Sequence, residues 1–259
     1  MTSAIPIVDL QEFNLTKAPE DVSDDVKRQL AAQIINAFST VGFVGLTNYG
    51  IPQDKLNMLM KEARNFFNLP ENIKQKYSCR PQYGDEIGGW EHIGQEQYGI
   101  HKHDPNYFKN QHKKGDISGP RYLYYPAITS QTDVKPNQIR CGEHSDYGSI
   151  TLLFQDDVGG LQLRSRNGKF VPATPKAGTM YINIGEVLQR WTADKLISTE
   201  HRVVIPETPS DREKVRMSVV YFAQPDRDCL IQCLDGSDKY EPITSLELLS
   251  RRLKATYPE

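Results

Sequence analysis

Two histidines and one aspartate stand where they could bind a single metal ion: His144 and Asp146 in GEHSDYGSITLLFQD, and His201 in STEHRVVIP. Two imidazoles and one carboxylate on one face of an ion leave its other positions open for substrate and dioxygen, as in non-haem iron(II) oxygenases. His144 and Asp146 are two apart, so on an extended segment both side chains point the same way. His201 follows 55 positions after Asp146, so the fold must bring distant strands together. Because divalent affinity follows the Irving–Williams order, zinc stays open as an occupant.

A second pair of polar residues, Arg216 and Ser218 in VRMSVVYF, is also spaced by two. Arginine supplies a permanent cation whose planar fork matches a carboxylate, and the serine hydroxyl lies on the same face of a strand. The alternative is a strand arginine paired with a surface acid, since most arginines are exposed. The pair therefore predicts an anion site without identifying the anion.

The amino-terminal part of the chain has the patterns of helices with short strands. Residues 24–40 carry apolar side chains at helical spacing, with aspartates in the first turn, and FVGLT at 43–47 has the composition of a buried strand. Residues 53–68 predict a second helix. The glycine-rich stretch from about 80 to 120 has no lasting periodicity and predicts mostly loop. We expect most of its histidines to be exposed: His92, His101, His103 and His112.

From residue 121 the chain consists of short apolar runs separated by turn signals. Asn167-Gly168 predicts a hairpin, 186–193 one or two helical turns, and 243–257 an amphipathic terminal helix. Short strands at this interval indicate a β-sandwich or jelly roll. The predicted strands are 121–125, 138–143, 149–155, 160–164, 169–173, 179–184, 200–205, 214–222 and 229–234.

The composition excludes several classes of protein. The chain has 259 residues, with 31 Lys and Arg against 33 Asp and Glu, a balance that argues against nucleic-acid binding. It has no apolar run long enough for a transmembrane helix and no secretory signal at its start. Its four cysteines have neither disulfide-framework nor zinc spacing. We therefore expect a cytoplasmic protein, without excluding the nucleus, that is a monomer and binds a small-molecule substrate.

Several blocks in order resemble the isopenicillin N synthase-like iron(II) and 2-oxoglutarate-dependent dioxygenases. They are IPIVDL (5–10), GFVGLTNYGIP (42–52), HSDYGSITLLFQDDVGGLQL (144–163), GTMYINIGEVLQRWT (178–192), STEHRVV (198–204) and RMS (216–218). The resemblance implies a mainly β fold with helices: a double-stranded β-helix (jelly roll) core at 121–259. An amino-terminal layer of helices and strands, with pocket loops, at 1–120 would pack on that core as one structural unit.

The resemblance also implies a function for the residues singled out above. His144, Asp146 and His201 would bind iron(II), and Arg216 and Ser218, joined by Tyr125, would hold the distal carboxylate of 2-oxoglutarate. Iron(II), 2-oxoglutarate and dioxygen would be required, with ascorbate as a candidate reductant. The expected reaction is hydroxylation, desaturation or ring closure of a small organic molecule, releasing succinate and carbon dioxide. No catalytic side chain is expected beyond the metal ligands.

Two departures from the family pattern stand out, and two alternatives stay open. Only about twenty residues separate GGWEHIGQEQYG (88–99) from RYLYYP (121–126), where relatives usually carry a longer segment, and Leu123 stands where plant relatives often have Asn. One alternative is an iron oxidase of the same fold that does not use 2-oxoglutarate. The other is a shortened, catalytically silent homologue that acts as a binding protein.

Overall fold

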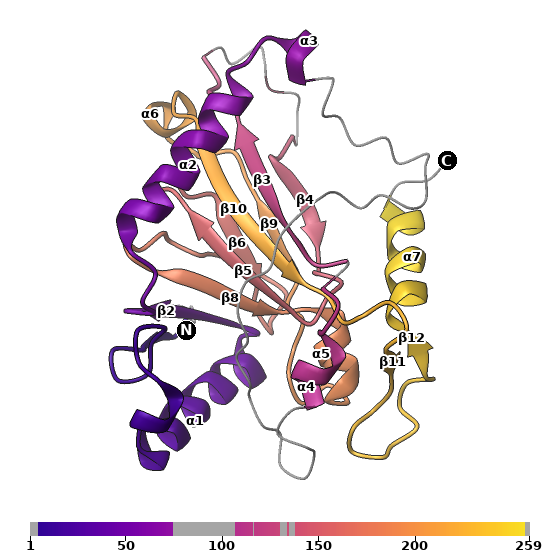
Figure 1. Cartoon of the computed structure of the whole chain (residues 1–259). Helices are drawn as coiled ribbons and strands as arrows, with labels where there is room; N and C mark the ends of the chain where they lie inside the picture. The colour runs from indigo at the N-terminus through magenta and orange to yellow at the C-terminus, as the bar shows by residue number, and fades with distance from the viewer. Residues whose placement is uncertain (1–4, 75–106, 116, 130–133, 135–137, 257–259) are drawn as a thin grey trace.

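The computed structural model describes residues 5–74, 107–115, 117–129, 134 and 138–256, and is built on two facing sheets (Figure 1). The larger sheet has six strands in the order β1-β2-β8-β5-β10-β3, parallel between β1 and β2 and antiparallel elsewhere. Its strands are β1 (Ile7–Asp9), β2 (Phe43–Thr47), β8 (Met180–Ile184), β5 (Ile150–Gln155), β10 (Arg216–Ala223) and β3 (Gly119–Tyr125). The smaller antiparallel sheet runs β4 (Cys141–His144), β9 (His201–Val203), β6 (Leu161–Arg164) and β7 (Phe170–Pro172).

One hydrophobic core lies between the two sheets, as expected of a jelly roll. Strand side chains alternate between faces, so every second residue points into this space. The buried cluster joins both sheets: Leu153, Tyr181 and Val220 come from the larger one, and Leu161, Leu163 and Val203 from the smaller one. Apolar area buried on this scale is the main term that holds the sheets together.

The outer face of the larger sheet is covered by α1 (Asp24–Thr40). Ser23 caps this helix by accepting a hydrogen bond from the backbone N–H of Val26. Leu30, Ile34 and Phe38 line its buried side and pack on Val44 and Leu46 of β2, whereas Phe43 faces the inter-sheet core. Gly42 lets the chain turn from helix to strand, with a φ of 74° that disfavours other residues.

The remaining helices surround the strands. α2 (Gln53–Phe67) runs along one side of the sheets and α7 (Ser245–Thr256) lies on the opposite side (Figure 1). Near α7, the ribbon β11 (Leu230–Ile231) and β12 (Ile243–Thr244) packs with α5 (Glu186–Trp191) around the fully buried Trp191. Four shorter helical elements complete the described residues: η1 (Pro19–Asp21), α3 (Glu71–Lys74), α4 (Tyr107–Gln111) and α6 (Pro209–Arg212).

Much of the predicted secondary structure is confirmed. The helix at 24–40 has the predicted bounds, the strand at 43–47 is β2, and Asn167-Gly168 closes the hairpin between β6 and β7. The strand predicted at 138–143 instead begins at Cys141 and reaches His144. In the amino-terminal segment, β1 and β2 extend the larger sheet.

Two features of the described part of the stretch from 80 to 120 depart from the general expectation of loop and exposed histidines. Tyr107–Gln111 is helical, because Tyr107 and Phe108 pack edge-on against Trp191 and fix a turn too short to show periodicity. His112 is not exposed: its ring contacts the Phe108 carbonyl at 2.6 Å and the Ser149 hydroxyl at 2.8 Å. His92, His101 and His103 lie outside the described residues. None of the helices in the described ranges is long and apolar enough to cross a membrane.

Candidate metal centre and anion pocket

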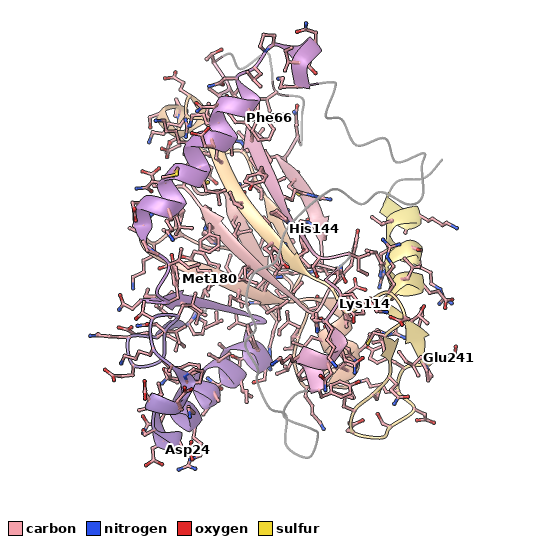
Figure 2. All side chains as sticks on the ribbon, viewed as in Figure 1. Asp24, Phe66, Lys114, His144, Met180 and Glu241 are labelled. Atoms are coloured by element: carbon pink, nitrogen blue, oxygen red, sulfur yellow. The ribbon has the colours of Figure 1, made fainter. Side chains whose placement is uncertain are left out.

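The two distant histidines meet because β4 and β9 are neighbours in the smaller sheet. His144, the last residue of β4, is the cross-strand partner of His201, the first residue of β9. The pairing shifts register between Cys141 and His144, an irregularity of the kind that re-aims a side chain. Figure 2 shows His144 among the strands at the centre of the molecule. The two imidazole ring centres are 4.3 Å apart.

Asp146 completes a cluster with these histidines. One carboxylate oxygen, Oδ1, lies 3.8 Å from Nε2 of His144 and 3.8 Å from Nε2 of His201. One ligand atom from each of the three residues lies within 4.8 Å of the others, which leaves room for a single cation between them. The side chains of Asp146 and His201 are 4% and 10% exposed, and that of His144 is 36% exposed, so the cluster opens to solvent on the His144 side.

Hydrogen bonds at the far side of each imidazole orient the rings. Nδ1 of His144 lies 2.8 Å from the Gly142 carbonyl oxygen, and Nδ1 of His201 lies 3.1 Å from that of Thr199. A carbonyl oxygen can only accept, so each Nδ1 carries a proton, and each Nε2 is the atom that can present a lone pair to the centre when the imidazole is neutral. Metal-binding histidines are held in the required tautomer by partners of this kind.

Asn183 on β8 does the same for the carboxylate. Its amide nitrogen donates to Oδ2 of Asp146 at 2.7 Å, which leaves Oδ1 facing the two histidines. Both residues are buried, 2% and 5% exposed. Sequence analysis did not single out Asn183. The available signal was a polar residue inside the apolar strand MYINI, at a position that strand alternation directs toward the core.

A tight packing of two turns fixes the backbone after Asp146. The Asp146 carbonyl accepts from the Glu186 N–H at 2.8 Å, and the Gly148 carbonyl accepts from Val187 N–H at 3.0 Å. A Cβ at Gly185 would lie 2.2 Å from the Gly148 carbonyl oxygen, closer than any real contact. Glycine at this position therefore lets the start of α5 approach the metal cluster.

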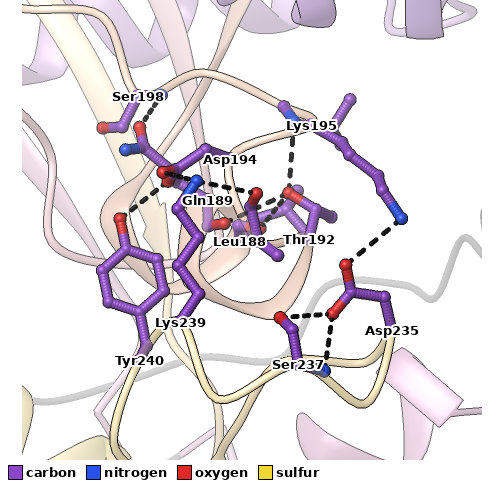
Figure 3. A network of polar contacts seen from close by, with 12 residues as sticks. Leu188, Gln189, Thr192, Asp194, Lys195, Ser198, Asp235, Ser237, Lys239 and Tyr240 are labelled. Atoms are coloured by element: carbon purple, nitrogen blue, oxygen red, sulfur yellow. Dashed lines mark hydrogen bonds and ion pairs between the residues drawn. The ribbon is translucent and has the colours of Figure 1, made fainter.

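The loop between α5 and β9 is held by a polar network that determines where His201 begins its strand (Figure 3). Gln189 accepts from the Ser198 N–H at 2.6 Å, and the Tyr240 hydroxyl donates to Asp194 at 2.7 Å. Asp194 also forms an ion pair with Lys239 and has a φ of 68°. Contacts from the carboxy-terminal segment thus stabilise a strained turn at Asp194, seven residues before His201.

Burial affects both imidazoles, but with different outcomes. At His201 burial lowers the pKa and outweighs the opposite effects of the Asp146 carboxylate and the Thr199 carbonyl. At His144 burial also acts to lower the pKa, but the Cys141 thiol, the Gly142 carbonyl and the Asp146 carboxylate outweigh it and raise the pKa to about 9. A cation must bind the neutral imidazole, so metal affinity at this cluster should increase with pH.

The donor set fits a divalent first-row metal. Two imidazole nitrogens and one carboxylate oxygen converge, and the other polar atom of each side chain is hydrogen-bonded to the protein. No described cysteine belongs to the cluster. A closed four-ligand structural site would need a fourth protein ligand. Two histidines and one carboxylate with open positions match the iron(II) facial arrangement.

The predicted anion residues lie together where β10 begins, in a buried polar cluster that we call the anion pocket. Arg216 is 1% exposed and is the cross-strand partner of Tyr125 on β3. Its guanidinium donates to the Gly159 carbonyl at 2.7 Å, the Ser218 hydroxyl at 3.3 Å and the Gln155 side-chain oxygen at 3.0 Å. The structure therefore brings together the three predicted residues. Burial lowers the pKa of Arg216, but an arginine side chain keeps its positive charge in proteins.

Tyr125 lies between two cations in this pocket. The guanidinium carbon of Arg216 is 5.2 Å from its ring centre, and that of Arg140 is 5.8 Å away. Both distances are within the range of cation–π attraction. Burial raises the pKa of Tyr125, so the phenol is neutral at physiological pH. Arg140 was not predicted from the sequence.

The pocket holds one carboxylate, Asp156, at the end of β5. It accepts from the backbone N–H of Met217 and, at 3.2 Å, from that of Val158. Burial raises the pKa of this carboxyl group. In the part of the chain that the structure describes, Asp156 makes no hydrogen bond to Arg216 or Arg140. The two positive guanidinium charges exceed the single negative charge of this carboxylate.

Two family models match the chain. Residues 118–225 match the 2OG-Fe(II) oxygenase superfamily, and residues 5–126 match the amino-terminal region of a non-haem dioxygenase in morphine synthesis. The first match includes the metal cluster and the anion pocket.

Characterised relatives extend over nearly the whole chain. The 2-oxoglutarate-dependent dioxygenase htyE of Aspergillus rugulosus is 29% identical, with 98% of this chain and 99% of the relative covered. The proline hydroxylase buaE of Petromyces alliaceus is 29% identical, with 85% and 91% covered. The alignment with htyE spans 336 positions, against 259 residues here, so htyE contains internal residues that this chain lacks.

A solved structure agrees with these relatives. A full-length Neurospora crassa protein, crystallised in complex with alpha-KG and thymine, superposes with a TM-score of 0.82 at 30% identity, and 98% of this chain and 97% of that chain are covered. The jelly-roll fold predicted from the sequence is confirmed by this similarity.

Proposed function

Because the chain belongs to the 2OG-Fe(II) oxygenase superfamily, and is thus an iron(II)- and 2-oxoglutarate-dependent dioxygenase, we propose that His144, Asp146 and His201 are its iron ligands. The observation that carries this assignment is the convergence of the two Nε2 atoms and Oδ1 on one point. Bound iron(II) supplies dioxygen activation coupled to the oxidative decarboxylation of 2-oxoglutarate. The protein contributes ligand orientation through Asn183 and the two backbone carbonyls.

The same proposal assigns the distal carboxylate of 2-oxoglutarate to the anion pocket. Iron(II) with one aspartate has a net charge of +1, so a dianionic cosubstrate needs a further cation, and Arg216 is the buried guanidinium available for it. Ser218 offers a hydroxyl beside it, and Tyr125 a neutral phenol ring. Charge-assisted hydrogen bonds to a carboxylate are among the strongest that proteins make. Arg216 and Ser218 therefore position the cosubstrate and do not transfer protons.

The substrate is proposed to be a small organic molecule that is hydroxylated, desaturated or cyclised. Thymine in the Neurospora crassa complex and the name of the proline hydroxylase both support a compact substrate. The open side of the metal cluster at His144 is where such a molecule would approach. We infer no general base among the side chains, since the metal centre and the cosubstrate perform the oxidation.

An anaerobic titration tests both assignments. Metal-free protein is mixed with iron(II) and then with 2-oxoglutarate while the visible absorption spectrum is followed. A charge-transfer band that requires both additions is expected, and thymine, proline and related compounds are then screened by succinate release in air. Iron binding without the band would contradict the cosubstrate assignment. Failure to bind iron would contradict the ligand assignment.

A further inference from the structure

Arg140 stands one residue before β4, and its guanidinium group makes no hydrogen bond to any residue that the structure describes. Its backbone N–H donates to the Val203 carbonyl at 2.8 Å, which fixes the residue beside β9. All three side-chain nitrogens are buried, and none has a hydrogen-bond partner among the described residues. Burying a guanidinium group without hydrogen bonds is unfavourable, so donors left open in this way favour a site for an anionic ligand.

A second free donor lies in the same pocket. Gln155 accepts from Arg216 through its side-chain oxygen, which identifies the other amide atom as the nitrogen. That nitrogen is buried and has no partner among the described residues. Of the eight buried side-chain polar atoms without a partner in the described ranges, four belong to Arg140 and Gln155. Half of these atoms are thus hydrogen-bond donors around the anion pocket, which is what an anion site requires.

The charges of the pocket also require an anion. Arg140 and Arg216 flank one tyrosine ring, with Asp156 as the nearby carboxylate. Burial, and then the charge of Arg216, lowers the pKa of Arg140, which reflects the cost of holding both cations there. Together with iron(II) and Asp146, the two arginines and Asp156 give a net charge of +2. This charge is neutralised by one dianion, whereas without Arg140 the loaded site would remain negative.

We propose that Arg140 is a second guanidinium for the distal carboxylate of 2-oxoglutarate, with the Gln155 amide as an auxiliary donor. This inference rests on the proposed function of Arg216 and deepens it. Arg216 already spends its donors on three protein acceptors, whereas Arg140 has all of its side-chain donors free of described partners. Arg140 is therefore a residue that determines specificity for a dicarboxylate over a monocarboxylate 2-oxo acid.

The experiment compares two ligands on manganese(II)-loaded protein without turnover. 2-Oxoglutarate and 2-oxopentanoate have the same five-carbon chain and the same chelating end, but 2-oxopentanoate ends in a methyl group. Their affinities are measured by calorimetry for the wild type, Arg140→Met and Arg140→Lys. We expect Arg140→Met to weaken 2-oxoglutarate binding about ten- to hundredfold, with 2-oxopentanoate binding unchanged. Arg140→Lys should be intermediate, because it keeps the charge but loses the fork.

The stability of the ligand-free protein separates this role from a structural one. Because the Arg140 side chain has no hydrogen bond to lose among the described residues and a methionine can still pack on the Tyr125 ring, Arg140→Met should melt at the wild-type temperature or above it. Arg202→Met is the matched control, since Arg202 also lies over an aromatic ring, Phe170, but is partnered by Gln162 and Glu143. It should leave binding of both ligands unchanged.

Each other outcome overturns a defined statement. Equal 2-oxoglutarate affinity in Arg140→Met and the wild type would refute the role of Arg140 and leave that of Arg216 intact. Parallel loss of both ligands with a lower melting temperature would show that Arg140 is structural. A wild type that binds 2-oxopentanoate as tightly as 2-oxoglutarate would refute the assignment of the whole pocket.

Discussion

The metal cluster (His144, Asp146 and His201) and the anion pocket (Arg216, Ser218 and Tyr125, with Arg140 and Gln155) satisfy their polar groups in opposite ways. In the metal cluster each residue uses its remote atom for a fixed partner and leaves the central atom free. In the anion pocket the guanidinium of Arg216 is already occupied by protein acceptors, and the free donors belong to its neighbours.

This difference has energetic consequences. A cation entering the metal cluster meets atoms already aimed at it, so the interactions gained there replace few existing ones. A carboxylate entering the anion pocket must displace internal hydrogen bonds of Arg216, so its affinity is the difference between bonds gained and bonds lost. Changes to the metal cluster should therefore have larger effects than changes to the anion pocket.

The largest expected effect is that of Asp146→Ala. Removing this carboxylate eliminates one of three converging atoms and also leaves the amide of Asn183 without its partner. Metal affinity and metal-dependent succinate formation should each fall by more than about a hundredfold, the upper limit for loss of an outer partner of a ligand. Metal content after dialysis and succinate yield are the measurements.

Asp157, an exposed aspartate outside the metal cluster, provides the control for that change. Asp157→Ala should retain metal and activity, and circular dichroism should show that both variants are folded. Wild-type metal content in Asp146→Ala would remove Asp146 from the ligand set.

Arg216→Lys comes next and tests the anion pocket. Lysine keeps the charge but cannot reproduce the three directed hydrogen bonds of the fork. The concentration of 2-oxoglutarate needed for half-maximal turnover should rise about ten- to hundredfold, while iron affinity measured without cosubstrate stays at the wild-type value. If both quantities changed together, Arg216 would be supporting the fold around the metal cluster and would not be an anchor.

The sequence predicted the parts of this comparison that depend on short-range patterns. The helix at 24–40 begins at a serine cap and ends before a glycine, signals that operate within one turn. Spacing by two placed Arg216 and Ser218 on one face of β10, because strand periodicity is fixed. Sequence spacing alone could not show that His144 and His201 share one site, and that prediction depended on the resemblance to the dioxygenase family.

The sequence could not show contacts that depend on register and packing between segments. The direct pairing of His144 with His201 depends on an irregularity within β4–β9 that no local pattern encodes. Arg140 precedes β4 and reaches Tyr125 across the sheets, a contact that only the folded chain defines. Helix α4 has five residues, too few for a periodic signal, and packing of Phe108 on Trp191 stabilises it.

A smaller effect is expected from Asn183→Leu, which tests whether the metal cluster is organised in advance. Leucine keeps a similar volume but removes the donor to Oδ2 of Asp146, so the carboxylate should sample other orientations. Metal affinity should fall about tenfold, the lower end of the range for an outer partner. Calorimetric titration with manganese(II) measures this change. An unchanged affinity would mean that the turn at Gly185, and not Asn183, orients Asp146.

The smallest effect is expected from Ser218→Ala, which sharpens the account of the anion pocket. The hydroxyl accepts a long hydrogen bond from Arg216, 3.3 Å, and Arg216 keeps two shorter ones without it. A neutral hydroxyl contributes roughly 0.5–1.5 kcal/mol, so the 2-oxoglutarate requirement should rise only a few-fold. Measured beside Arg216→Lys in one assay, a modest loss supports a secondary role in which the Ser218 hydroxyl adds one hydrogen bond to a carboxylate held mainly by Arg216. Tighter binding in Ser218→Ala would instead show that the hydroxyl competes with the carboxylate for the guanidinium, and a loss as large as that of the arginine variant would contradict the secondary role.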